Sequence, residues 1–148
     1  MLTPHFKIEH EFRGHRDDVR SICSRSGSST HFATASRDKT IRIWNLDHDE
    51  TSLLDQKVYD GHDSFVTCVK WVPEGYLDIK DEILLSGSRD RRVLVWSIPR
   101  GVVLKELNGH SMDITAVIVL KNGDIVTASQ DSHICVWRNF KLLKVFGF

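Results

Sequence analysis

A short motif recurs three times along this chain of 148 residues. Each copy begins with Gly-His, continues with Ser-Xaa-Asp and ends with a Trp six residues after the Asp. The three histidines are separated by 47 and 48 residues. Repeats of roughly 40 to 50 residues are typical of β-propellers, in which each repeat forms one blade. The motif residues are His15, Ser36, Asp38 and Trp44; His62, Ser88, Asp90 and Trp96; and His110, Ser129, Asp131 and Trp137.

The segments between these markers have the two-residue periodicity and the β-branched residues of strands. Examples begin at Thr40, Arg92 and His133, and no stretch carries a helical stripe. The pattern predicts an all-β fold with three four-stranded antiparallel blades. The blades are expected at about 13–60, 61–108 and 109–148, with the strands of the first near 19–24, 32–36, 40–46 and 53–59, and with later inner strands beginning near Phe65 and Ile114.

The second repeat contains an insertion. Its His and Trp are 34 residues apart, against 29 and 27 residues in the other two repeats. The polar, turn-rich segment from Pro73 to Asp81 is the expected site. Such a segment is typical of a surface loop between two strands.

Three blades are too few for a closed ring, since propellers have roughly four to eight. The sequence therefore predicts an incomplete propeller. Two interpretations remain: a truncated product or gene fragment, or a half-ring that pairs with a second copy. In either case the open blade edges favour self-association.

The charge balance is neutral, with 20 Lys and Arg residues against 20 Asp and Glu residues. A chain without a positive field is not expected to bind nucleic acid or an anionic membrane. The longest aliphatic run, residues 116–120, is too short to span a bilayer, and no signal peptide is recognisable. We expect a soluble intracellular protein, in the cytoplasm and with the nucleus as a second compartment. Cys23, Cys68 and Cys135 lie in apolar segments and are expected to be reduced core residues.

The four motif residues are expected to form a hydrogen-bonded tetrad inside each blade. His15 would bond Asp38, and Ser36 would lie between the imidazole and the indole N–H of Trp44. The same residue types build Ser-His-Asp hydrolases. Three equivalent copies and the absence of a nucleophile elbow argue against catalysis, so no catalytic residue is expected.

Metal and phosphate sites are not expected either. His5, His10 and His15, followed by Cys23, are spaced so that successive histidines fall on opposite faces of an extended chain. The segment 87–90 lacks the second glycine and the lysine of a phosphate-binding loop. We therefore expect no metal and no cofactor.

The motif series resembles that of the WD-repeat family. Within it, FRGHRDDVRSIC and TASRDKTIRIW in the first blade resemble the phospholipase A2 activating protein family, as do GHDSFVTCVKWVP in the second and VWRNFKLLKVF in the third. The resemblance implies a propeller whose top face binds ubiquitin, in a cofactor of the ubiquitin-selective AAA ATPase named valosin-containing protein. It also implies that residues 6–12 are an orphan strand, which would close a last blade. The family's ATPase-docking domain has no counterpart in this sequence, so binding to the ATPase is not expected here.

The candidate partner-binding residues follow each Gly-His or precede each motif Asp. They are Arg16, Asp18, Arg37, Asp63, Phe65, Arg89, Ser111, Asp113 and Gln130. Phe65 has two interpretations: an exposed anchor for a hydrophobic patch on ubiquitin, or a side chain packed against its own blade. The alternatives to ubiquitin binding are a scaffold for a different protein partner and a fragment without a function of its own.

Overall fold

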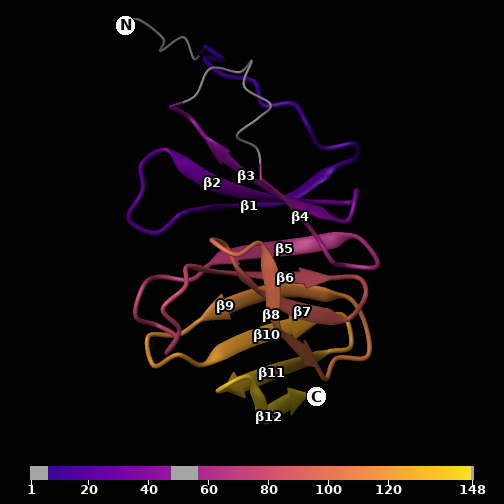
Figure 1. Cartoon of the computed structure of the whole chain (residues 1–148). Coiled ribbons are helices and arrows are strands. Elements are labelled where there is room, and N and C mark those ends of the chain that lie inside the picture. Colours follow the sequence, from indigo (N-terminus) through magenta and orange to yellow (C-terminus); the bar gives the residue numbers. More distant parts are fainter. Residues whose placement is uncertain (1–6, 48–56, 148) are drawn as a thin grey trace, which may run out of the picture.

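The computed structural model describes residues 7–47 and 57–147 and confirms the all-β class (Figure 1). Within these ranges the chain forms three separate four-stranded antiparallel sheets, which follow one another in chain order. The sheets do not close into a ring, as the sequence predicts. The described residues contain no helix, and therefore none long and apolar enough to cross a membrane.

Each sheet is one blade whose strands follow chain order from the inner to the outer edge. The first contains β1 (Val19–Ser24), β2 (His31–Ser36), β3 (Thr40–Asn45) and β4 (Lys57–Asp60). The second contains β5 (Val66–Trp71), β6 (Ile83–Ser88), β7 (Arg92–Ser97) and β8 (Val102–Asn108). The third contains β9 (Ile114–Val119), β10 (Ile125–Ser129), β11 (His133–Arg138) and β12 (Lys141–Gly147). Of the strand expected at 53–59, residues 53–56 lie outside the described residues.

The hydrophobic core lies between the blades. Ile41 and Tyr59 of the first blade pack with Leu84 and Trp96 of the second in one buried cluster. A second cluster joins blades 2 and 3, with Leu85, Val95, Ile114 and Trp137 among its members. Each fully buried large apolar side chain contributes about 1.5–3 kcal/mol. A blade therefore depends on its neighbours for most of its stabilisation.

In blades 2 and 3, the glycine of the Gly-His pair permits a close approach by the indole of the same blade. A Cβ at Gly61 would lie 2.8 Å from Cη2 of Trp96, and one at Gly109 would lie 2.8 Å from Cη2 of Trp137. Any larger residue would have to displace a buried ring. The spacing between glycine and tryptophan in the motif is therefore a packing requirement.

The segment before the first blade packs its last aromatic residue on that blade. The ring of Phe12 lies edge-on to Trp44, with 5.4 Å between centroids, much as Tyr59 lies edge-on to Trp96 at 5.8 Å. Residues 7–12 pair with no strand of the described chain, and Phe6 lies outside it. A strand needs a hydrogen-bonded neighbour, and the predicted orphan closing strand has none here.

Both outer flanks of the three-blade unit expose apolar side chains. On the first blade, Val19 is 54% exposed and Ile22 is 65% exposed. On the third, Ile134 and Phe146 are each nearly half exposed, and all of β12 is exposed. The equivalent faces inside the unit are buried cores, so these flanks are the open edges that the sequence predicts.

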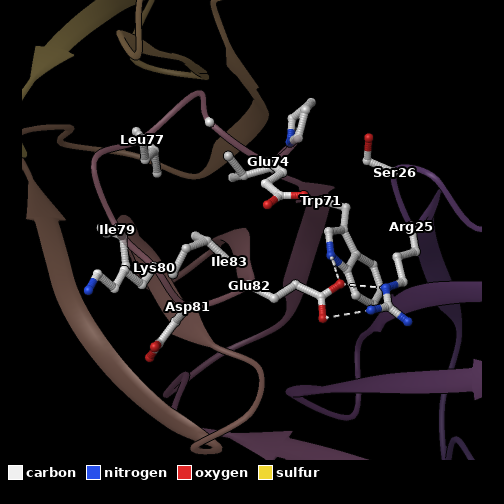
Figure 2. Close-up of a pocket in the computed structure, with 13 residues that line it drawn as sticks. Arg25, Ser26, Trp71, Glu74, Leu77, Ile79, Lys80, Asp81, Glu82 and Ile83 are labelled. Carbon is white, nitrogen blue, oxygen red and sulfur yellow. Dashed lines mark hydrogen bonds and ion pairs between the residues drawn. The ribbon is translucent and has the colours of Figure 1, made fainter.

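The insertion of the second repeat forms the loop between β5 and β6, as predicted. Tyr76, Leu77 and Ile79 pack against the core shared by blades 2 and 3. At the loop's end, Glu82 accepts from Arg25 of the first blade, with Nε at 2.5 Å, and from the indole N–H of Trp71 at 2.9 Å (Figure 2). The loop therefore contacts all three blades at the end of the sheets opposite the motif histidines.

The three cysteines are free thiols in or beside the core. Cys68 and Cys135 are buried and Cys23 is partly buried. Burial raises the pKa of the Cys68 thiol to about 11. A thiol in that state stays protonated near neutral pH, and only the thiolate is a good nucleophile or metal ligand.

Candidate functional site

The histidine and aspartate of each tetrad meet as predicted. Nδ1 of the histidine lies 2.8 Å from Oδ2 of the aspartate in blades 1 and 2 and 2.9 Å from it in blade 3. Burial alone would raise the pKa of Asp90, but hydrogen bonds from His62 and from two backbone N–H groups outweigh it and hold that pKa well below its ordinary value. The aspartate is therefore ionised in the folded protein.

The expected position of the serine is wrong. The hydroxyl between the imidazole and the indole belongs to a residue two positions earlier on the same strand. In blade 2 this is Ser86, whose Oγ lies 2.7 Å from Nε2 of His62 and accepts from Nε1 of Trp96 at 2.8 Å. Thr34 and Thr127 do the same in the other blades, in place of Ser36 and Ser129.

Strand register explains the correction. Trp96 pairs with Leu84, so Ser88 lies four residues away along the strand, or about 13 Å at 3.3 Å per residue. Ser86 lies on the same face and is only half as far from the indole. The sequence carried a usable signal, because a Thr or Ser occurs ten residues before each motif Trp.

The serine of Ser-Xaa-Asp instead fixes the loop that enters the blade. Ser88 Oγ donates to the carbonyl of Ser64 at 3.2 Å and accepts from the N–H of Asp90 at 3.0 Å. Two neighbouring contacts complete the clamp: Asp90 Oδ2 accepts from the N–H of Asp63, and the N–H of Arg89 donates to the carbonyl of Phe65. Blades 1 and 3 repeat all of these bonds, with Ser36 donating to Asp17 and Ser129 donating to Met112.

The chain of Asp90, His62 and Ser86 has the connectivity of a hydrolase triad, but its hydroxyl is sealed. Ser86 is fully buried, so no substrate can reach its oxygen. The indole N–H can only donate, which leaves the serine to donate to the imidazole and the imidazole to donate to the carboxylate. Such a chain, satisfied at every step, is a structural network.

The candidate partner-binding residues lie at one end of the sheets, which we call the top face. It consists of the loops entering β1, β5 and β9 and the turns between the second and third strands of each blade. Ion pairs join neighbouring members: Arg37 to Asp18 at 3.0 Å, and Arg89 to Asp113 at 3.7 Å. The latter pair links blades 2 and 3.

Phe65 lies between two arginines of the top face. The guanidinium carbon of Arg37, from blade 1, is 4.7 Å from the centre of the Phe65 ring, and that of Arg89 is 5.4 Å from it. The ring is partly buried. Both sequence interpretations thus describe part of its environment, because the ring is held in place but remains partly accessible beside cations.

The remaining candidates lie on the same loops and turns of the top face. Arg16 and Ser111 are exposed, and their backbone N–H groups are held by the tetrad aspartates of their blades. Asp63 is exposed and pairs with Arg92 at 2.9 Å. Gln130 is exposed, and its N–H donates to the carbonyl of Asp113 at 3.0 Å.

No group of three or more His, Cys, Asp or Glu side chains in residues 7–47 and 57–147 is arranged to hold a metal ion. His15 and Cys23 belong to the tetrad and to the core of the first blade. His5 lies outside the described residues.

Three antiparallel sheets, each with a buried Asp-His-hydroxyl-Trp network, define a repeat protein of the β-propeller class. The sequence matches the family described as WD domain, G-beta repeat, over residues 6–45, 55–97 and 101–138. The chain therefore belongs to the WD-repeat family.

Several relatives share the repeats over most of this chain. It is 30% identical over 132 residues to ubiquitin homeostasis protein lub1 of Schizosaccharomyces pombe, covering 89% of this chain and 18% of lub1. It is 34% identical over 121 residues to nuclear distribution protein PAC1 of Candida tropicalis, covering 80% of this chain and 23% of PAC1. It is 26% identical over 139 residues to phospholipase A-2-activating protein of Xenopus laevis, covering 93% of this chain and 17% of that protein. The chain thus spans less than a quarter of the length of these relatives.

Proposed function

We propose that this WD-repeat scaffold binds ubiquitin through its top face, with Phe65 as the central contact. The observation that carries the proposal is the position of this ring, partly accessible and held between arginines of two blades. Aromatic residues at the centre of a rigid surface are frequent hot spots of protein interfaces. The hydrophobic patch of ubiquitin offers a matching apolar contact.

Two further observations support a protein partner of this kind. The top face carries both signs of charge, with Asp18 and Asp113 beside Arg37 and Arg89, which favours a protein over a nucleic acid. One relative is named a ubiquitin homeostasis protein, and another is phospholipase A-2-activating protein, the family that the sequence resembles. Binding to an AAA ATPase is not part of the proposal.

The test is an NMR titration of ¹⁵N-labelled ubiquitin with the 148-residue chain. We expect shifts concentrated on the hydrophobic patch of ubiquitin and a loss of affinity of about tenfold or more in Phe65→Ala, which corresponds to about 1.4 kcal/mol. Phe146→Ala is the matched control, because Phe146 is a partly exposed aromatic on the outer flank of blade 3. Unshifted ubiquitin, or equal losses in the two variants, would refute the proposal.

If ubiquitin does not bind, the second candidate is a scaffold for another protein partner on the same face. Cytoplasmic and nuclear location stays a prediction from the sequence. Self-association through the exposed flanks also stays a prediction, which light scattering over a range of protein concentrations would measure.

A further inference from the structure

A hollow of about 230 Å³ opens beside Phe65 on the top face. Three arginines line it, together with the ring itself and a small number of polar groups. The lining residues are Arg20, Arg37, Phe65, Thr67, Arg89, Asp113 and Gln130. Arg37 and Arg89 form the ion pairs and cation-π contacts described above, whereas Arg20 takes part in none of them.

Arg20 reaches the hollow because of a β-bulge. In the pairing of β1 with β2, Val19 is opposite Ser36 and Ser21 is opposite Ala35, so Arg20 is the extra residue. A bulge redirects the side chain of its extra residue and often occurs beside a functional site. The side chain of Arg20 is exposed and forms no ion pair with any residue in the described part of the chain.

The other two blades place a neutral residue in the same bulge. There the extra residues are Thr67 and Thr115. The hydroxyl of Thr67 lies within hydrogen-bond distance of two backbone carbonyls, of Gly87 and Ile114, so it has partners within the protein. The fold therefore accepts threonine at this position, and packing does not require an arginine in blade 1.

The charges of the hollow leave a single positive excess. Three guanidinium groups and the carboxylate of Asp113 line the hollow. Asp18 does not line it but forms an ion pair with Arg37, so the three arginines and these two carboxylates together carry a net charge of +1. An arginine stacked on a ring keeps N–H groups at its edge for further hydrogen bonds. One carboxylate of a ligand would neutralise the hollow, whereas a phosphate dianion would leave it negative.

We propose that this hollow receives an aspartate or glutamate side chain of the partner, held by Arg20 and its two neighbouring arginines beside the Phe65 ring. The proposal rests on the top face being the binding surface, but it does not require that the partner be ubiquitin. Guanidinium and carboxylate groups form strong, directional, charge-assisted hydrogen bonds. Arg20 would then select acidic over neutral segments.

The test uses the ¹⁵N-labelled 148-residue chain and three synthetic peptides observed by NMR. They are Gly-Leu-Asp-Leu-Gly, the same peptide with Asn in place of Asp, and the same peptide with phosphoserine there. We expect the aspartate peptide to shift the Nε–Hε signals of the hollow's arginines with at least tenfold higher affinity than the asparagine peptide. The phosphoserine peptide should bind no more tightly than the aspartate peptide.

Arg20→Thr is the informative variant, because it installs the residue that blades 2 and 3 carry at the bulge. It should lower the affinity for the aspartate peptide about fivefold or more and leave the affinity for the asparagine peptide unchanged. Lys105→Gln on the exposed outer strand of blade 2 controls for net charge and should change neither.

Equal binding of the aspartate and asparagine peptides, no binding of either, or equal effects of Arg20→Thr and Lys105→Gln would overturn the proposal. Tighter binding of the phosphoserine peptide would overturn the assignment to a carboxylate. Selective binding of the aspartate peptide together with unshifted ubiquitin signals would refute only the proposal that the partner is ubiquitin. If ubiquitin binds equally well to the Arg20→Thr variant and no peptide is preferred, only the proposal of a carboxylate-binding hollow would be refuted.

Discussion

Replacing Ser86 with alanine should destabilise the protein more than any other loss of a single hydroxyl in blade 2. Its Oγ is the only partner that the structure gives to the indole N–H of Trp96 and to Nε2 of His62, and all three residues are buried. Each buried polar group left without a partner costs about 1–3 kcal/mol. Two such groups give an expected loss of about 2–6 kcal/mol, a large fraction of the roughly 5–15 kcal/mol that stabilises a typical domain.

Urea unfolding followed by tryptophan fluorescence would measure this loss. With a slope of about 1–3 kcal/mol per molar urea, the midpoint of Ser86→Ala should fall by about 1 M or more. Ser86→Thr is the matched control, since threonine occupies the equivalent positions in blades 1 and 3, and it should cost less than about 1 kcal/mol. An unchanged midpoint in the alanine variant, or an equal loss in the threonine variant, would show that the hydroxyl does not hold the network.

Three further perturbations test other parts of the structure. Gly87→Ala should cost about 1–3 kcal/mol, because the new Cβ would lie 2.4 Å from Cγ2 of Ile114 across the interface of blades 2 and 3; an unchanged urea midpoint would contradict this. Glu82→Gln should lower the melting temperature by weakening the bond to Arg25, and a double-mutant cycle with Arg25→Gln should show coupling above about 0.5 kcal/mol. The pKa of Asp90 is lower in the folded than in the unfolded protein, so its stabilisation is present above about pH 4 and is lost as the pH falls below that. In Asp90→Asn, the free energy of unfolding should therefore fall less steeply with decreasing pH below about pH 4. An equally steep fall in the variant would contradict the assignment.

The architecture can be predicted from the sequence because the same packing contacts recur in every blade and fix the spacing of the residues that make them. The glycine, histidine, aspartate and tryptophan positions are fixed by contacts within one blade, such as the indole of Trp96 against Gly61, and they therefore recur at regular spacing. Alternating apolar residues place the strands, and β1 begins and ends at the predicted residues. Local spacing was sufficient for these features.

The errors arose where strand register decides between neighbours of similar chemistry. Ser86 and Ser88 are both hydroxyl residues on one face of β6, and only the pairing of Leu84 with Trp96 shows which is near the indole. The environment of Phe65 was equally inaccessible, because one of its two arginines comes from another blade. The place of Arg20 in the hollow could not be predicted, because its side chain is directed there by a bulge and no residue type marks a bulge in the sequence.

In each blade, hydrogen bonds connect the tetrad to the loop that forms part of the top face. In blade 2, residues 88–90 hold three consecutive loop residues through the N–H of Asp63 and the carbonyls of Ser64 and Phe65. The loop is thus ordered before any partner arrives, and its conformational entropy is not lost again on binding. Through these bonds the buried network, which no ligand can touch, would support the proposed recognition by holding Phe65 in place. It follows that substitutions within the tetrad should weaken partner binding even in variants that remain folded.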